Sequence, residues 1–148
     1  MNYRFTKRTG GASLGAFASL NLGTHVGDNL ELVIKNREIL RSEVGPVQFM
    51  NQVHGDRIAL IEEVTDEIPT ADALVTGIPG ISLAVMVADC IPLLLSSPES
   101  VAAVHVGRKG LINEITRKTI SLMRDMGASE ITAIIGPAIC GSCYEVSD

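Results

Sequence analysis

Residues 73–106 read ALVTGIPGISLAVMVADCIPLLLSSPESVAAVHV, and this stretch decides the fold. It contains four short runs of apolar and β-branched residues, at 73–76, 82–87, 92–96 and 101–106, which Gly, Pro or Ser separate. Such punctuation is typical of strands joined by turns. Several of the runs are apolar throughout, which predicts strands that are covered on both faces.

The segments on either side of this stretch continue the pattern. Residues 47–53 and 57–61 predict strands that flank a tight turn at His54. Apolar residues from Leu111 to Met126 recur at helical spacing and predict one helix, which ends at the glycine that follows. Residues 131–135 then predict another buried strand. Strands interrupted by helices predict a mixed α/β architecture.

The N-terminal part is less regular. Residues 1–8 predict a short edge strand, and residues 12–30, rich in Gly, Ser and Asn, predict a long ordered loop. Asp28 or Asn29 can cap a helix over residues 31–43, which a Gly-Pro pair ends.

Length and composition limit the class of protein. The 148 residues fit a single globular domain, with 46% hydrophobic and 20% charged residues. The net charge is −5, and no segment concentrates Lys and Arg, so nucleic acid is not an expected partner. The most apolar window, residues 78–95, is interrupted by Asp89 and two prolines, so we expect no membrane span. An odd number of cysteines and a polar N-terminus without an apolar core favour the cytoplasm.

Three residues with metal-binding side chains stand at the ends of apolar runs: His54, Cys90 and His105. Two imidazoles and one thiolate fit a catalytic zinc site whose fourth position stays open for water or substrate. A histidine at a strand end is also typical of a hydrogen-bonded structural residue, and a buried cysteine often acts as a small hydrophobe. The spacing alone leaves these interpretations open.

Longer motifs surround these residues. In chain order they are Arg8-Thr9-Gly10-Gly11-Ala12-Ser13, the run from Ser19 to Asp28, Asn51-Gln52-Val53-His54-Gly55, Asp72-Ala73-Leu74-Val75-Thr76, Ala88-Asp89-Cys90, Ala103-Val104-His105-Val106-Gly107, Gly136-Pro137-Ala138-Ile139 and Cys143-Tyr144-Glu145-Val146. Together they resemble the YfiH-like family, also called the laccase-domain or multicopper polyphenol oxidase family. The resemblance covers nearly the whole chain, in order.

This resemblance implies a fold, an activity and a metal site. The fold is a compact layered α/β sandwich with mixed sheets and helices. The activity is phosphorolysis of adenosine, inosine, guanosine and methylthioadenosine, together with deamination of adenosine, so the expected partners are a purine nucleoside and inorganic phosphate. The implied metal ligands are His54, Cys90 and His105, with zinc as the metal and copper as the alternative. Family members extend well beyond this length, so we expect residues 1–148 to form one domain that lacks the family's C-terminal part.

Further residues are candidates for substrate binding and proton transfer. The donors proposed for phosphate or nucleoside are Arg8, Asn21, Gln52, Arg108 and Lys109. His25 is either a pocket residue or a loop cap, and Asp89 is either a proton shuttle or a carboxylate that orients a ligand. The family usually has Gly-Trp-Arg-Gly after its second histidine ligand, whereas this chain has Arg108 and Lys109 between the two glycines. Lys109 keeps a cation there without the bidentate fork of arginine.

Three other functions use the same residues. Cys90 activated by His105 or His54 would make a metal-free cysteine hydrolase. Two histidines and one cysteine also fit a blue-copper-like site, and hence a laccase-like polyphenol oxidase. A non-catalytic binding module is the last alternative. Cys140 and Cys143 form a separate CxxC, which fits a redox pair or two thiols in a turn beside the pocket. It also fits half of a four-cysteine zinc site, but the sequence has no second CxxC to complete one.

Overall fold

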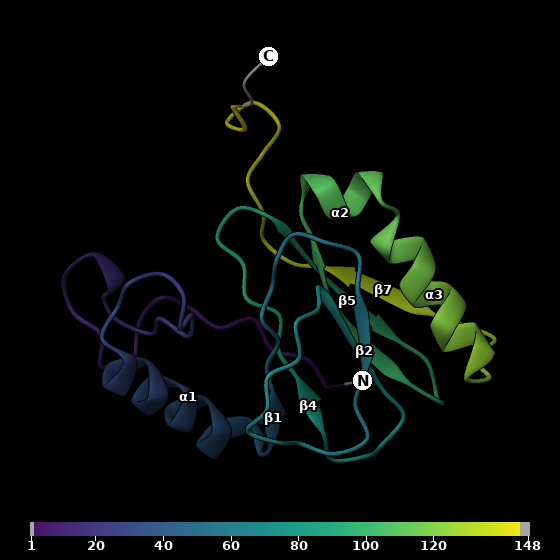
Figure 1. Cartoon of the computed structure of the whole chain (residues 1–148), viewed down its shortest axis with the longest axis horizontal. Coiled ribbons are helices and arrows are strands. Elements are labelled where there is room, and N and C mark those ends of the chain that lie inside the picture. Colours follow the sequence, from purple (N-terminus) through teal and green to yellow (C-terminus); the bar gives the residue numbers. More distant parts are fainter. Residues whose placement is uncertain (1, 146–148) are drawn as a thin grey trace. The chain divides into compact units, whose positions relative to one another are not determined.

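A computed structural model of the chain describes residues 2–145. It contains two compact units, Asn2–Val47 and the remainder from Gln48 onward. One long helix dominates the first unit, and the main sheet belongs to the second (Figure 1). No helix in residues 2–145 is long and apolar enough to cross a membrane. One domain over residues 1–148 stays a prediction.

The main sheet of the second unit has five strands in the order β2-β3-β6-β5-β7. β2 pairs with β3 in parallel, and every other neighbouring pair is antiparallel. The strands are β2 (Ile58–Leu60), β3 (Ala73–Thr76), β5 (Ile91–Ser96), β6 (Val101–Val106) and β7 (Thr132–Ile135). Mixed pairing in a sheet with helices confirms the predicted α/β class.

The central strands of this sheet come from residues 73–106. β3 and β6 match the predicted runs, and β3 is buried along its whole length, as expected for strands covered on both faces. β5 and β6 form a hairpin whose turn is closed from Ser97: its amide donates to the Ser100 carbonyl (2.8 Å), and its hydroxyl accepts from the Ser100 amide (3.0 Å). The hairpin register places His105 opposite Pro92.

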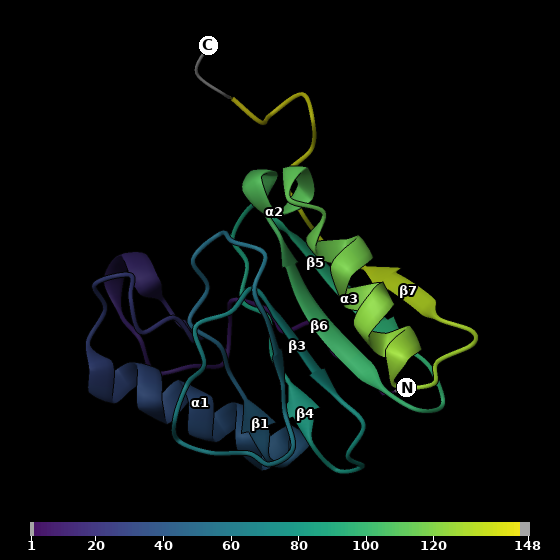
Figure 2. The ribbon, with the colours of Figure 1, turned by 45° about the vertical axis from the view of Figure 1, so that its right-hand side comes forward.

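The predicted helix from Leu111 to Met126 is two helices. α2 (Arg108–Ile112) and α3 (Ile115–Asp125) are separated at Glu114, which has the left-handed φ of 59°. α3 lies along one face of the sheet, and α2 lies at the end of the sheet where β6 finishes (Figure 2). Ile115, Thr119 and Met123, spaced four residues apart, are buried on the sheet side of α3. Leu111 and Ile112 are 64% and 71% exposed, because the break at Glu114 interrupts the helical periodicity that predicted a single apolar face.

Residues 131–135 form a strand, but the prediction that it is buried was wrong. β7 lies at the edge of the sheet, next to β5, and three of its four residues are exposed. Ile135 is 68% exposed. Apolar composition alone cannot distinguish an edge strand from a central one.

Two other predicted strands are much shorter than expected. The runs 47–53 and 82–87 contribute only β1 (Val47–Gln48) and β4 (Ser82–Leu83), which pair with each other. Further along, a side chain replaces the strand ladder: the Gln52 amide donates to the Met86 carbonyl (2.6 Å) and accepts from the Met86 backbone amide (2.8 Å). The segments therefore stay side by side without regular strand pairing.

The first unit contains the helix expected after the loop, α1 (Leu30–Val44). The Asn29 side chain caps it by accepting from two backbone amides of the first turn, and Gly45 ends it at a φ of 80°. Its buried face contains Val33 and Leu40 together with the polar residues Asn36 and Arg37.

The long loop before α1 is ordered around the side chain of Asn36. This amide donates to the Ser13 hydroxyl and to two loop carbonyls, and accepts from the Ala12 backbone amide. A short 3₁₀ helix, η1 (Gly15–Phe17), interrupts the loop. The predicted edge strand over residues 1–8 was wrong for residues 2–8, which have no strand pairing, and Met1 lies outside the described residues.

Two isoleucines on either side of Glu114 test this account of the core. Ile115→Ala should lower the free energy of unfolding by about 2–4 kcal/mol, because it leaves a cavity under α3. The matched change Ile112→Ala removes an exposed side chain and should alter it by less than about 0.5 kcal/mol. Urea unfolding measures both, and equal costs would contradict the division of the helix at Glu114.

Candidate metal centre

His54, Cys90 and His105 come together in the second unit. Their nearest ligand atoms, two imidazole nitrogens and one thiol sulfur, all lie within 4.8 Å of one another. His105 lies near the end of β6, Cys90 directly precedes β5, and His54 lies in the bend before β2. The two imidazole rings meet edge to face, with centroids 4.7 Å apart. The sequence prediction that these three residues converge is confirmed.

A fourth residue, Asp72, holds two of these ligands in place. Its side chain is fully buried directly before β3. One carboxylate oxygen accepts from His105 Nδ1 (2.8 Å) and from the His54 backbone amide (2.9 Å). The other oxygen accepts from the backbone amides of Gly55 (2.7 Å) and Val53 (3.3 Å). One buried carboxylate thus binds both the ring of one ligand and the backbone of the other.

These bonds decide which nitrogen of His105 is available. The carboxylate accepts a hydrogen bond from Nδ1, so the proton of the neutral ring is on Nδ1 and the lone pair is on Nε2. A carboxylate behind a ligand histidine is the common arrangement in protein metal sites, where it fixes the tautomer and the ring orientation. Nε2 of His105 is therefore ready to bind a cation.

The bend that carries His54 is unusual for a residue with a side chain. His54 has a φ of 58°, in the left-handed region that disfavours residues with a Cβ. Because the amides at 53, 54 and 55 all donate to Asp72, the bend holds this conformation and turns the imidazole toward Cys90 and His105. Backbone strain of this kind is typical of functional sites.

The glycine that follows β6 leaves room for the three side chains. A Cβ placed on Gly107 would lie 3.0 Å from His54 Cδ2 and 3.2 Å from Cys90 Sγ. Contacts this short with a side-chain carbon and a sulfur would push the ligands apart. Gly107 therefore keeps the space beside the three ligands free of a side chain.

Without a cation, the Cys90 thiol is less ionised than an ordinary thiol. Burial is the main cause that raises the pKa of its thiol, and the negative charges of Asp89 and Asp72 raise it further. The same negative surroundings attract a cation, which favours the thiolate form of a ligand cysteine. The donor set, the cradle at Gly107 and the charge around Cys90 all fit a metal ion. Asp89, the residue before Cys90, is exposed. Its role as a proton shuttle stays a prediction.

The structure gives Gln52 a different partner from the predicted one. Both ends of its side-chain amide bind the backbone of Met86, as described for the fold. Gln52 therefore holds the segment that leads to Cys90 next to the segment that leads to His54. A contact with substrate stays a prediction.

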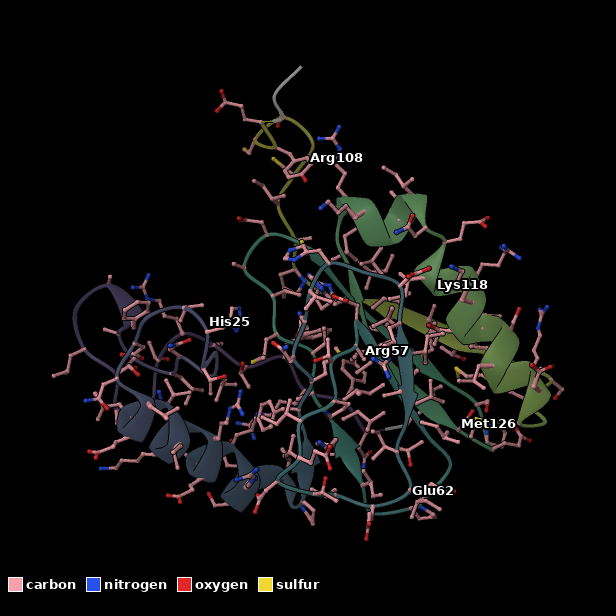
Figure 3. All side chains as sticks on the ribbon, in the orientation of Figure 1. His25, Arg57, Glu62, Arg108, Lys118 and Met126 are labelled. Atoms are coloured by element: carbon pink, nitrogen blue, oxygen red, sulfur yellow. The ribbon has the colours of Figure 1, made fainter. Side chains whose placement is uncertain are left out.

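Arg108 and Lys109 begin α2, immediately after Gly107, and both are exposed. The Arg108 side chain extends from the start of that helix toward solvent (Figure 3). Two cations thus follow the metal centre directly along the chain, and their role with phosphate stays a prediction.

The remaining predicted binding residues belong to the first unit. Arg8 donates to the carbonyls of Ala16 (3.1 Å) and Ala18, and Asn21 donates to the Asp28 carboxylate (2.9 Å). Hydrogen bonds from Asn21 and then from Ser13 lower the pKa of Asp28. His25 is exposed in the loop (Figure 3). These contacts organise the loop, and a role for the three residues with substrate stays a prediction.

Comparison with known proteins identifies the group to which this architecture belongs. A family model described as "Multi-copper polyphenol oxidoreductase laccase" matches residues 2–148. A purine nucleoside phosphorylase of Corynebacterium glutamicum is 43% identical, over 97% of this chain and 63% of its own length. A purine nucleoside phosphorylase of Streptomyces coelicolor is 41% identical, over 99% of this chain and 65% of its own length. The chain thus spans less than two thirds of these curated relatives.

Solved structures agree with this grouping. A Neisseria meningitidis protein superposes with a TM-score of 0.87 at 43% identity, covering 94% of this chain and 58% of the other. The YlmD protein of Geobacillus stearothermophilus gives 0.85 at 34% identity, covering 95% and 59%. The YfiH protein of Bacillus licheniformis gives 0.83 at 32% identity, covering 93% and 58%. The resemblance inferred from the motifs is confirmed.

The role of Asp72 can be tested by exchanging one oxygen for an amide. In Asp72→Asn the side chain keeps its shape but has only one acceptor atom. Either His105 or the bend at 53–55 must then lose its partner. Zinc affinity should fall about 10- to 100-fold, as it does when such supporting residues are changed in other metal sites. Competition with a chromophoric chelator measures the affinity, and ¹⁵N spectra of the histidine rings report the His105 tautomer.

The matched control is Asp125→Asn at the exposed end of α3, which should leave zinc affinity unchanged. Urea unfolding of the metal-free Asp72→Asn protein separates loss of metal binding from loss of the fold. A folded Asp72→Asn protein with wild-type zinc affinity and an Nδ1-protonated His105 would contradict the role assigned to Asp72.

Proposed function

The chain belongs to the multi-copper polyphenol oxidoreductase laccase family, and on that premise we propose that it is part of a zinc-dependent purine nucleoside phosphorylase. The proposed metal ligands are His54, Cys90 and His105. The proposed substrates are inorganic phosphate and the nucleosides adenosine, inosine, guanosine and methylthioadenosine, with deamination of adenosine as a second activity. The activity of the whole protein is part of the proposal, because the chain spans 63% and 65% of the Corynebacterium glutamicum and Streptomyces coelicolor relatives.

The observation that carries the proposal is the cluster of two imidazoles and one thiol, which Asp72 supports and which Gly107 approaches closely because it has no side chain. Three protein ligands are typical of catalytic zinc, whereas structural zinc usually has four. The burial of the three ligands is graded: His105 is buried, Cys90 is half-buried and His54 is exposed. A site with one exposed side is accessible to a substrate. A zinc ion held there supplies a Lewis acid.

The residues around this centre suggest a division of work. Phosphorolysis needs cations to bind the phosphate dianion and a carboxylate or imidazole to handle the proton of the departing base. We assign the first task to Arg108 and Lys109, which begin α2 directly after Gly107. Asp89 stands next to Cys90 for the second. Gln52 supports the site through Met86 rather than by free donors.

The three-ligand set supports zinc in this proposal, with copper as the alternative metal. A laccase-like polyphenol oxidase, the copper alternative, needs several metal ions with further histidine ligands to reduce oxygen. Within residues 2–145, the cluster of His54, Cys90 and His105 is the only group of three or more His, Cys, Asp or Glu residues placed to bind a metal. The metal content of the purified chain distinguishes copper bound to this cluster from zinc.

The surroundings of Cys90 disfavour the cysteine hydrolase. A hydrolytic cysteine needs a thiolate at neutral pH, and the positive charge or helix terminus that stabilises one lowers its pKa. Burial and two carboxylates raise the pKa of Cys90 instead. We also propose a cytoplasmic protein, because Cys90, Cys140 and Cys143 are all free thiols.

Metal content and turnover test the proposal together. The purified chain should contain about one zinc per chain, as expected for a single three-ligand site, and His54→Ala and Cys90→Ala should lose both the metal and the release of free purine from inosine. Cys140→Ala is the matched cysteine control and should keep its zinc, since Cys140 lies outside the cluster. Plasma mass spectrometry measures the metal, and copper in place of zinc would overturn the proposal.

Alkylation separates the metal enzyme from the cysteine hydrolase. In the metal-free chain the raised pKa keeps the Cys90 thiol protonated at pH 7, so its reaction with iodoacetamide should be slow. The reaction should accelerate only when the pH exceeds the pKa of an ordinary cysteine thiol. Peptide mass spectrometry over a pH series measures this rate. Fast alkylation of Cys90 at pH 6–7, with esterase activity in metal-free protein, would favour the hydrolase.

A further inference from the structure

A second pair of thiols lies apart from the metal ligands. Cys140, Gly141, Ser142 and Cys143 form a turn in which the Cys143 amide donates to the Cys140 carbonyl (3.0 Å). This segment follows β7 and projects beyond α2, away from the sheet, in both views of the ribbon (Figures 1 and 2). Both cysteines are free and exposed.

The turn brings the two cysteines within bonding range. A four-residue turn closed by this hydrogen bond places its first and last Cα atoms less than about 7 Å apart. Disulfides in proteins join Cα atoms about 4.4–6.8 Å apart. The backbone of residues 140–143 therefore needs little or no rearrangement to accommodate a disulfide between its ends.

One of the two thiols is activated by its neighbours. Cys140 Sγ lies 3.2 Å from the Ser142 hydroxyl, which can donate to a thiolate. Hydrogen bonds from Ser142 and from Cys143 lower the pKa of Cys140 to about 7. At neutral pH the exposed Cys140 is then more ionised than an ordinary thiol, which is typical of the attacking cysteine of a redox pair.

We propose that Cys140 and Cys143 form a reversible dithiol–disulfide site that reacts with small-molecule disulfides such as oxidised glutathione. The Cys140 thiolate attacks one sulfur of the small disulfide, forming a mixed disulfide and releasing one glutathione thiolate. Cys143, after losing its proton to solvent, attacks the Cys140 sulfur, which forms the Cys140–Cys143 bond and releases the second glutathione. The protein loses two electrons and the small disulfide gains two.

The site is connected to the metal centre through the backbone. The Ile139 amide, next to Cys140, donates to the carbonyl of Asp89 (3.0 Å), which precedes Cys90. The Gly136 amide donates to the Pro92 carbonyl (2.9 Å). The redox turn thus begins directly after a segment bonded to residues on both sides of Cys90. The pair itself needs no metal, so the redox proposal does not depend on the proposed nucleoside chemistry.

Peptide mapping after equilibration with glutathione tests the proposal. The reduced full chain is incubated at pH 7.5 with mixtures of oxidised and reduced glutathione, quenched with acid, alkylated and digested with trypsin. Cleavage after Arg124 releases residues 125–148, which contain Cys140 and Cys143 without Cys90. We expect this peptide to carry one internal disulfide in oxidising mixtures and two alkyl groups in reducing ones.

Three variants separate the roles. Cys143→Ser should accumulate the mixed disulfide on Cys140, and Cys140→Ser should react slowly. Ser142→Ala should move the pH midpoint of Cys140 reactivity above about 7. At pH 7 its exchange with oxidised glutathione should slow by up to about three- to fourfold, since a less acidic thiol is less ionised but more nucleophilic.

Two results would overturn the proposal. One is a peptide 125–148 that stays fully alkylated, or that gains two separate mixed disulfides, in strongly oxidising mixtures. The other is a disulfide that forms only between two copies of the chain, which a non-reducing gel detects.

Discussion

The arrangement of the three candidate ligands depends on one buried carboxylate. Asp72 accepts from the ring of His105 and from three consecutive amides of the bend that presents His54. Burying this carboxylate without these donors would cost desolvation free energy. The hydrogen bonds that avoid this cost hold the His105 ring and the bend at His54 to the same side chain. Two ligands that are far apart in the chain therefore keep one geometry.

The second-unit sheet supplies the rigid frame for this carboxylate. Asp72 directly precedes β3, whose four residues are all buried, and its backbone carbonyl accepts from the His105 amide (2.7 Å). His105 is held in the adjacent strand β6, which also pairs with β5 directly after Cys90. Neighbouring strands thus fix the positions of Asp72, Cys90 and His105. The hydrogen bonds from the bend to Asp72 fix the position of His54.

The three cysteines show how position decides the chemistry of one residue type. Cys90 is half-buried beside two carboxylates, and its pKa is raised. Cys140 is exposed in a turn, and hydrogen bonds from Ser142 and Cys143 lower its pKa to about 7. The environment of Cys90 suits a metal ligand that loses its proton when a cation binds. The environment of Cys140 suits a thiol that reacts with an oxidant in solution.

The sequence by itself determined the central strands and the helix after Asn29, because these follow from local patterns. Its motifs also pointed to His54, Cys90 and His105 as candidate metal ligands. Only the tertiary structure decided that Asp72 connects two of the ligands, that Gln52 binds Met86, and that β7 lies exposed at an edge. It also decided that Glu114 divides the second helical stretch. A pattern of apolar residues indicates which side chains avoid water. It does not indicate which strand lies at an edge of the sheet or which buried polar groups form hydrogen bonds. Strand order and these hydrogen bonds depend on contacts between distant parts of the chain.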